Sequence, residues 1–172
     1  GCSGTDVVRV VVAPALSASI QSVPVRCHGG SDGAATVSVQ GGISPFTYQW
    51  NNGCTSVQCN GLAAGSYSAT VVDAIGCQTT VSVQVTQPDP LVVGLQTSDS
   101  TSCYAACDGS ATAQVSGGTP PYSYLWNSVP SQQAAQASGL CPATYWCRMT
   151  DSKGCMDSVS STILQPTPVV LS

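Results

Sequence analysis

The clearest structural signal in the sequence is the stretch Gly41-Gly42-Ile43-Ser44-Pro45-Phe46-Thr47-Tyr48-Gln49-Trp50. It returns 76 positions later as Gly117-Gly118-Thr119-Pro120-Pro121-Tyr122-Ser123-Tyr124-Leu125-Trp126. In each copy, glycine and proline predict a turn, and three aromatic residues then alternate with smaller or polar ones. Because successive side chains of a strand point to opposite sides, the three rings share one face. The pattern predicts a half-buried strand whose aromatic face anchors a small core.

The similarity between the two copies extends along the whole unit. The aligned positions include Cys27 with Cys103, Asp32-Gly33 with Asp108-Gly109, Tyr67 with Tyr145, Gly76-Cys77 with Gly154-Cys155, and Gln87-Pro88 with Gln165-Pro166. A match of this extent predicts two tandem domains of about 75 residues. We assign the first repeat to residues 15–88 and the second to residues 89–166.

A strand-like stretch lies outside the two repeats at each end of the chain. Residues 1–14 resemble the last strand of a preceding repeat, and residues 167–172 resemble the first strand of a following one. An apolar strand alone in water is prone to pair with another strand. We therefore expect these strands to complete a neighbouring repeat, or a neighbouring subunit through strand addition. The residues expected to do so are Val7, Val8, Val10, Val11, Val12, Val169, Val170 and Leu171.

The composition excludes several classes of protein. With four Lys and Arg in 172 residues, the chain has no basic patch for nucleic acid. Its longest apolar run, residues 7–16, contains Arg9 and Pro14 and is too short to span a bilayer. Apolar residues alternate with period two and show no helical spacing, which predicts an all-β chain.

In the first repeat we expect six short strands, near residues 15–22, 34–40, 46–50, 55–60, 66–72 and 79–86. Strands of this length and spacing predict a small Greek-key sandwich of immunoglobulin-like type. A domain this small has a thin core and benefits from disulfides. Ten cysteines in an acidic chain predict an oxidising compartment, and their spacing does not fit zinc.

No residue pattern predicts catalysis or a cofactor. Adjacent Cys27 and His28 point apart on an extended chain, and Tyr104 replaces His28 in the second copy. The recurring aspartates fit turns better than a calcium site, because each lacks closely spaced carboxylate companions. They are Asp32, Asp73, Asp108 and Asp151. We expect no enzyme.

The aromatic strands fit a core better than a carbohydrate-binding platform, because they recur on one face in both copies. Trp146 is the exception, since it lies on the face opposite Tyr145 and its counterpart in the first repeat is Ser68. It is the candidate for an exposed contact.

The order of these motifs resembles the SprB-type repeat. The motifs are Cys-x₄-Asp-Gly, Gly-Gly-x-x-Pro-aromatic-x-Tyr-x-Trp, Gly-Leu-x₄-Tyr, Asp-x-x-Gly-Cys and Gln-Pro, and they cover residues 15–166 twice over. Such repeats occur in very large surface adhesins of gliding bacteria and in related secreted proteins. The resemblance implies an extracellular tandem array that works as a stalk, adhesin or filament without catalysis. Cys54 and Cys59 depart from the cysteine-rich version that the second repeat resembles.

Strand parity places the Cys27 and Cys77 loops at the same end of the domain and favours a Cys27–Cys77 disulfide. The equivalent pair in the second repeat is Cys103–Cys155, by position. We further expect a local Cys54–Cys59 bond and a Cys107–Cys141 bond, while Cys2 and Cys147 remain unassigned. The sequence alone leaves the connectivity open.

The resemblance also suggests glycosylation. Bacteria in which such repeats are common place O-glycans on Asp-Ser/Thr followed by an apolar residue or Thr, which makes Ser100 and Ser158 candidates. An intact mass equal to that of the bare polypeptide would exclude this hypothesis.

We therefore expect a structural subunit or repeat segment of an extracellular bacterial filament or giant cell-surface adhesin. Its partners would be copies of itself or neighbouring repeats, with no nucleic acid and no membrane span. Whether the chain is the subunit of a homopolymer or part of a longer array stays open. The alternative function is a non-catalytic ligand- or carbohydrate-binding module of a secreted protein.

Overall fold

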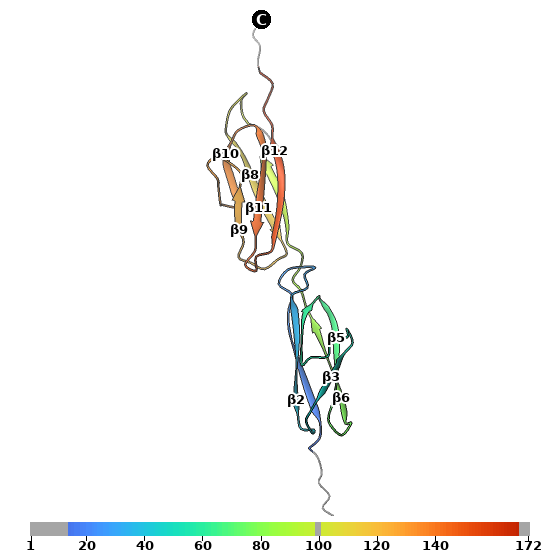
Figure 1. Ribbon diagram of the computed structural model, residues 1–172. Helices are drawn as coiled ribbons and strands as arrows, with labels where there is room; N and C mark the ends of the chain where they lie inside the picture. Colours follow the sequence, from blue (N-terminus) through green and yellow to red (C-terminus); the bar gives the residue numbers. More distant parts are fainter. Residues whose placement is uncertain (1–13, 99–100, 169–172) are drawn as a thin grey trace, which may run out of the picture. The chain divides into compact units, whose positions relative to one another are not determined.

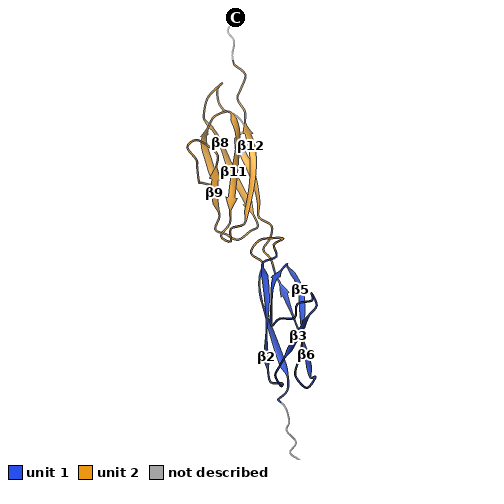
Figure 2. Ribbon diagram, in the orientation of Figure 1, with its two compact units in different colours: residues 1–24, 31–86 blue, residues 25–30, 87–172 orange. Residues whose placement is uncertain are grey.

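The computed structural model describes residues 14–98 and 101–168, where all regular secondary structure is β-strand (Figure 1). The chain divides into two compact units (Figure 2). The described residues of unit 1 are 14–24 and 31–86, and those of unit 2 are 25–30, 87–98 and 101–168. Residues expected to play a role that lie outside the described ones are Cys2, Val7, Val8, Val10, Val11, Val12, Ser100, Val169, Val170 and Leu171.

Unit 1 contains the six strands expected from the first repeat. They are β1 (Ser17–Val23), β2 (Gly33–Gln40), β3 (Thr47–Trp50), β4 (Gln58–Leu62), β5 (Gly65–Val72) and β6 (Gln78–Val85). These strands form two antiparallel sheets, in the orders β1-β2-β4 and β3-β5-β6. The short hydrophobic alternation of each strand buries one face and leaves the other in solvent, as in a sandwich.

Unit 2 repeats this arrangement with β7 to β12. Its strands are β7 (Val92–Ser98), β8 (Gly109–Ser116), β9 (Ser123–Trp126), β10 (Gln136–Leu140), β11 (Ala143–Thr150) and β12 (Met156–Ile163). The sheets are β7-β8-β10 and β9-β11-β12, which is the order of unit 1 six strands later. The prediction of an all-β chain with immunoglobulin-like sandwiches is confirmed.

The paired glycines at the start of each aromatic strand are required by a close backbone approach. Gly41 and Gly117 have φ angles of 69° and 67°, a region that residues with a Cβ rarely adopt. A Cβ on Gly41 would collide with the Ala15 carbonyl oxygen, and one on Gly117 with that of Pro90. The repeated Gly-Gly therefore lets the turn lie directly against the residues that precede the first strand of each repeat.

The core of each unit is built around the tryptophan that ends the aromatic strand. Trp50 is 2% exposed and Trp126 is fully buried. The indole N–H of Trp50 donates to the Ser56 carbonyl oxygen at 2.8 Å, and that of Trp126 donates to Ala134 at 2.9 Å. Each ring thus gains burial without leaving its polar atom unpaired.

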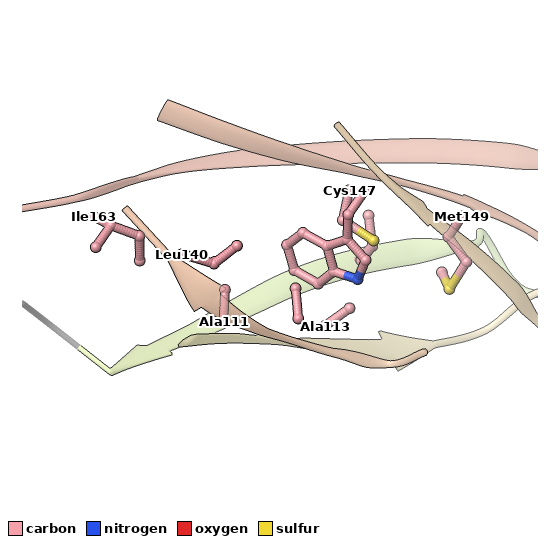
Figure 3. Packing of buried hydrophobic residues seen from close by; sticks show 9 residues of the cluster. Ala111, Ala113, Leu140, Cys147, Met149 and Ile163 are labelled. Carbon is pink, nitrogen blue, oxygen red and sulfur yellow. The ribbon is translucent and has the colours of Figure 1, made fainter. Parts of the chain in front are cut away.

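Around Trp126, the buried side chains of unit 2 come from both of its sheets. In Figure 3, one layer between the strands contains the side chains of Ala111, Ala113, Leu140, Cys147, Met149 and Ile163. Cys147 stands opposite Trp126 in the β9–β11 register, as Ala69 stands opposite Trp50 in unit 1. At this position unit 2 has cysteine where unit 1 has the smaller alanine. At the position of Val37 in unit 1, unit 2 has the smaller Ala113.

Candidate functional site: the cysteine loops

An aspartate organises the loop that carries the late cysteine of each repeat. In unit 2, one oxygen of Asp151 accepts hydrogen bonds from the N–H groups of Lys153 and Cys155, both at 2.9 Å. Its other oxygen accepts from the Thr119 N–H at 2.8 Å, so Asp151 ties this loop to the turn before the aromatic strand. These bonds assign Asp151 to turn formation.

Asp73 does the same in unit 1. One of its oxygens accepts from the N–H groups of Ile75 and Cys77, at 3.1 and 2.8 Å, and the other accepts from Ile43 at 3.2 Å. Both aspartates are buried, at 6% exposure for Asp73 and 5% for Asp151. In the described part of the chain, no group of three or more histidine, cysteine or acidic side chains is arranged to hold a metal ion.

We predict that Asp151 makes the stability of unit 2 depend on pH in the acid range. Burial of Asp151 raises the pKa of its carboxyl, but hydrogen bonds from Cys155, Thr119, Lys153 and Gly154 outweigh burial and hold the pKa below its usual value. A lowered folded-state pKa stabilises the fold above the ordinary aspartate pKa, about 3.9. This stabilisation is lost as the pH falls through the lower folded-state pKa.

The test is urea unfolding of unit 2 between pH 7 and pH 2, compared with Asp151→Asn. Asparagine offers one acceptor oxygen and places an amide group against a backbone N–H, so we expect a loss of about 1–3 kcal/mol at pH 7. The two proteins should converge as the pH falls from about 4 towards 2, because Asp151 is then progressively protonated in the folded state and loses the same interaction. If the free energies of unfolding of the two proteins differ by the same amount at every pH, Asp151 is not the source of the pH dependence.

The structure contains three disulfides among its described residues. Cys54 pairs with Cys59 and Cys107 pairs with Cys141, the same pairs that the sequence suggested. Cys27, however, bonds to Cys155, across a sequence separation of 128 residues. The expected Cys27–Cys77 and Cys103–Cys155 pairs are therefore absent, and both expectations are corrected.

The physical reason for this correction lies in the segment Val25–Gly30, which belongs to unit 2 although it follows β1 in the sequence. The Gly29 N–H donates to the Gln87 side-chain oxygen at 2.8 Å, and His28 Nδ1 lies 3.1 Å from the Pro88 carbonyl oxygen. Strand parity identifies the position within a repeat at which the partner of Cys27 lies, namely the loop before the last strand. It does not distinguish Cys77 from Cys155, because these two cysteines occupy the same place in their repeats.

Of the cysteines in the described residues, Cys77, Cys103 and Cys147 are free. Cys77 and Cys103 are exposed, whereas Cys147 is buried in the core of unit 2. Burial raises the pKa of the Cys147 thiol, which makes it less reactive. Cys27 cannot act as a thiolate nucleophile while it is bonded to Cys155, and its neighbour His28 interacts with the backbone of Pro88.

Two further candidates lie on exposed strand surfaces of unit 2. Trp146 of β11 is 41% exposed, on the face opposite the core. Ser158 of β12 is also exposed, and its register partner on β11 is Arg148. Both side chains are accessible to a partner or to a modifying enzyme. Residues 14–98 and 101–168 contain no helix that could span a membrane.

The comparisons with known proteins agree with the repeat pattern. The family model described as SprB repeat matches residues 19–55 and 95–130, which begin in the first strand of each repeat and extend beyond its aromatic strand. No curated protein matches the sequence.

Several solved structures resemble the chain at low sequence identity. An amphioxus IgVJ-C2 molecule is 13% identical with a TM-score of 0.37, covering 86% of this chain and 96% of that one. A C-terminal 282-residue fragment of intimin, in complex with the intimin-binding domain of its translocated receptor, is 12% identical with a TM-score of 0.44 and coverage of 88% and 64%. The N-terminal eight immunoglobulin domains of Down syndrome cell adhesion molecule are 12% identical, with a TM-score of 0.39 and coverage of 87% and 25%.

Likenesses at these scores carry no argument about function. The family match does, because it falls on two equivalent segments and each segment lies in a sandwich of the same strand order. Repeats of this family belong to surface or secreted proteins. The SprB repeat model thus matches one segment in each of two tandem immunoglobulin-like β-sandwiches, as expected for two copies of the repeat.

Proposed function

We propose that the chain is a structural segment of an extracellular bacterial filament or giant cell-surface adhesin. The observation that carries this proposal is the presence of two SprB repeats in tandem. Sandwiches of this type are typically non-catalytic, and their function in such arrays is to span distance and display contacts outside the cell.

The chemistry of the chain supports an oxidising, extracellular setting. Three disulfides occur among the described residues, and such bonds persist outside the reducing cytosol. With 7% charged residues, the surface relies on serine, threonine and glutamine for its polarity. Such a surface repels its copies only weakly, so a cover of O-glycans would help to keep neighbouring arrays apart. The exposure of Ser158 is consistent with modification there.

The assembly we propose uses strand addition. Residues 1–14 and 167–172 would each supply a strand to a neighbouring repeat, either in another copy of the chain or in the same longer polypeptide. Main-chain hydrogen bonds would supply much of the affinity, and Val8, Val10 and Val12, at alternate positions, would supply the buried face.

Electron microscopy of the purified chain tests this assembly. We expect the complete 172-residue chain to form regular fibres. A variant without residues 1–13 should remain as separate molecules, because it has lost the donated strand. A matched variant in which Val8, Val10 and Val12 become threonine keeps the length but lowers the apolar area, and should form fewer fibres. Fibres from the truncated chain would contradict strand donation by residues 1–13, and no fibres from the 172-residue chain would contradict strand addition between copies.

The exposed ring of Trp146 favours a second candidate function, binding of a carbohydrate or another ligand. Trp146→Ser introduces the residue that the first repeat has at the equivalent position, Ser68. Retained binding of a glycan panel after this substitution, or no binding by the original chain, would exclude Trp146 as a binding platform.

A further inference from the structure

The two exposed free cysteines, Cys77 and Cys103, occupy the same repeat positions as the two cysteines of the disulfide with the largest sequence separation. Cys103 corresponds to Cys27, after the first strand of its repeat, and Cys77 corresponds to Cys155, before the last strand. Cys27 and Cys155 are bonded to each other, whereas Cys77 and Cys103 are free and exposed. The bond thus joins an early cysteine of one repeat to the late cysteine of the repeat that follows.

The loop that carries Cys103 is held by the same interaction as the loop that carries Cys27. Two residues after Cys27, the Gly29 N–H donates to the side-chain oxygen of Gln87 at 2.8 Å. Two residues after Cys103, the Ala105 N–H donates to the side-chain oxygen of Gln165 at 3.0 Å. Gln87 and Gln165 are the equivalent glutamines of the two Gln-Pro motifs. Both early cysteines are therefore fixed against the segment that leaves their own repeat.

The backbone conformation of the two loops is also the same. Gly29 has a φ of 72°, and Ala105 has a φ of 59°. A positive φ is uncommon for a residue with a Cβ, and Ala105 is the one non-glycine residue among those described that adopts it. The second repeat therefore keeps the loop shape of the first without the glycine that favours it.

The loop of Cys77 likewise has the same form as the loop of Cys155. The Cys77 N–H donates to Asp73 at 2.8 Å, and the Cys155 N–H donates to Asp151 at 2.9 Å. The glycines before these cysteines have φ angles of 87° and 85°. The loop of Cys77 thus shares these backbone features with the loop of Cys155, which is already bonded to Cys27.

We infer that Cys103 forms a disulfide with the Cys77-type cysteine of a following SprB repeat, and Cys77 with the Cys103-type cysteine of a preceding one. Each repeat would then be bonded covalently to its neighbour, in the manner of Cys27–Cys155. The inference deepens the proposed function and rests on it for the presence of neighbouring repeats. The following repeat is either in a second copy of this chain or in the same longer polypeptide.

The bond forms by two thiol–disulfide exchanges with a small disulfide such as oxidised glutathione. The thiolate of Cys77 attacks the small disulfide, forms a mixed disulfide and releases one thiol. The thiolate of Cys103 from the other repeat then attacks the Cys77 sulfur and releases the second thiol. In total, the two protein thiols lose two electrons and two protons. The small disulfide takes up these electrons and protons and becomes two thiols.

The test uses two complementary variants of the complete chain, both with Cys2→Ser. One carries Cys77→Ser and retains Cys103, and the other carries Cys103→Ser and retains Cys77. Each is equilibrated in a glutathione redox buffer, alone and mixed, and cross-links are identified by peptide mapping without reduction. We expect each variant alone to give no covalent dimer and the mixture to give covalent dimers joined by Cys103–Cys77. The heterologous cross-link should exceed the like-with-like cross-links at least tenfold.

Equal amounts of all cross-links, or no cross-link in the mixture, would overturn the inference. Gln165→Ala in the Cys103-retaining variant should lower the yield of Cys103–Cys77, because it releases the Cys103 loop. The matched Gln87→Ala should leave the yield unchanged, because it acts on the loop of Cys27, which is already bonded. Equal yields from the two glutamine variants would contradict the role of the preformed loop.

The two sources of the partner repeat differ in mass. Protein taken from its natural source should contain the Cys103–Cys77-type peptide pair in both cases. Reduction would lower the apparent mass if the partner is a second copy, and would leave it unchanged if the partner lies in the same polypeptide. The outcome is also separate from strand addition. Fibres without the Cys103–Cys77 cross-link would overturn only the disulfide inference. The cross-link without fibres would overturn only the proposal that copies of the chain assemble into a filament by strand addition.

Discussion

Replacing Trp126 with alanine is expected to lower the free energy of unfolding of unit 2 by about 3–5 kcal/mol. The ring is fully buried among residues of both sheets, and its N–H satisfies the Ala134 carbonyl oxygen. A domain of about 75 residues is stable by about 4–11 kcal/mol, at roughly 0.05–0.15 kcal/mol per residue, so the loss is a large part of its stability. Hydrogen exchange followed by mass spectrometry checks it, because peptides from β8 and β11 report on unit 2 separately.

Trp50→Ala is the matched control, because it removes the equivalent ring from unit 1. It should destabilise peptides of β2 and β5 and leave those of β8 and β11 unchanged. Trp126→Phe keeps most of the apolar area but leaves the Ala134 oxygen without its donor, so we expect a smaller loss of about 1–3 kcal/mol. A loss below about 1 kcal/mol for Trp126→Ala would show that the ring does not hold the core together.

Removing the Cys27–Cys155 disulfide by the double substitution to serine is expected to destabilise unit 2 by about 2–4 kcal/mol. In the chain-entropy account, a disulfide restricts the unfolded chain more when it closes a longer loop, and this one closes a loop across 128 residues. The loss should appear as faster hydrogen exchange in residues 25–30 and in the Asp151 loop.

The double substitution of Cys54 and Cys59 is the matched control in unit 1. These residues are five positions apart, so the bond closes a short loop and its removal should cost less. Equal losses from the two double variants, or a loss in unit 1 when Cys27–Cys155 is removed, would contradict the assignment of that bond to unit 2.

The alternation of apolar residues was enough to predict the strands, because both sheets of each sandwich bury one face. The strand expected at residues 66–72 is β5, Gly65–Val72, and the one expected at 79–86 is β6, Gln78–Val85. The strand expected at 55–60 begins later, at Gln58. The Ser56 carbonyl accepts the indole N–H of Trp50, and such a side-chain contact is not visible in a hydrophobic pattern.

The cysteine pairing was only partly predictable, because the sequence contains two equivalent copies of each loop. Cys54 and Cys59 are close in sequence, so proximity alone suggested their bond. For Cys27, strand parity favoured Cys77, but Cys155 occupies the equivalent repeat position, and its choice depends on Val25–Gly30 belonging to unit 2. Tertiary packing determines that this segment belongs to unit 2, and strand parity within one repeat gives no information about such packing.

The roles of the two loop aspartates followed from local rules, whereas the role of Cys147 did not. Asp73 and Asp151 precede glycine and cysteine at turn spacing, and their side chains bond nearby backbone N–H groups as expected. The disulfide pattern gives Cys147 no partner, whereas its alignment with Ala69 in an alternating strand is a signal of a small buried residue. Comparing the two copies position by position could have identified it.

The disulfide map of the oxidised chain tests most directly the claim that successive repeats are bonded to one another. Proteolysis without reduction, followed by mass spectrometry, identifies which cysteine-containing peptides are joined. The account predicts a peptide pair containing Cys27 and Cys155, with separate pairs for Cys54–Cys59 and Cys107–Cys141. A map with Cys27–Cys77 and Cys103–Cys155 would contradict it, because each repeat would then be closed on itself.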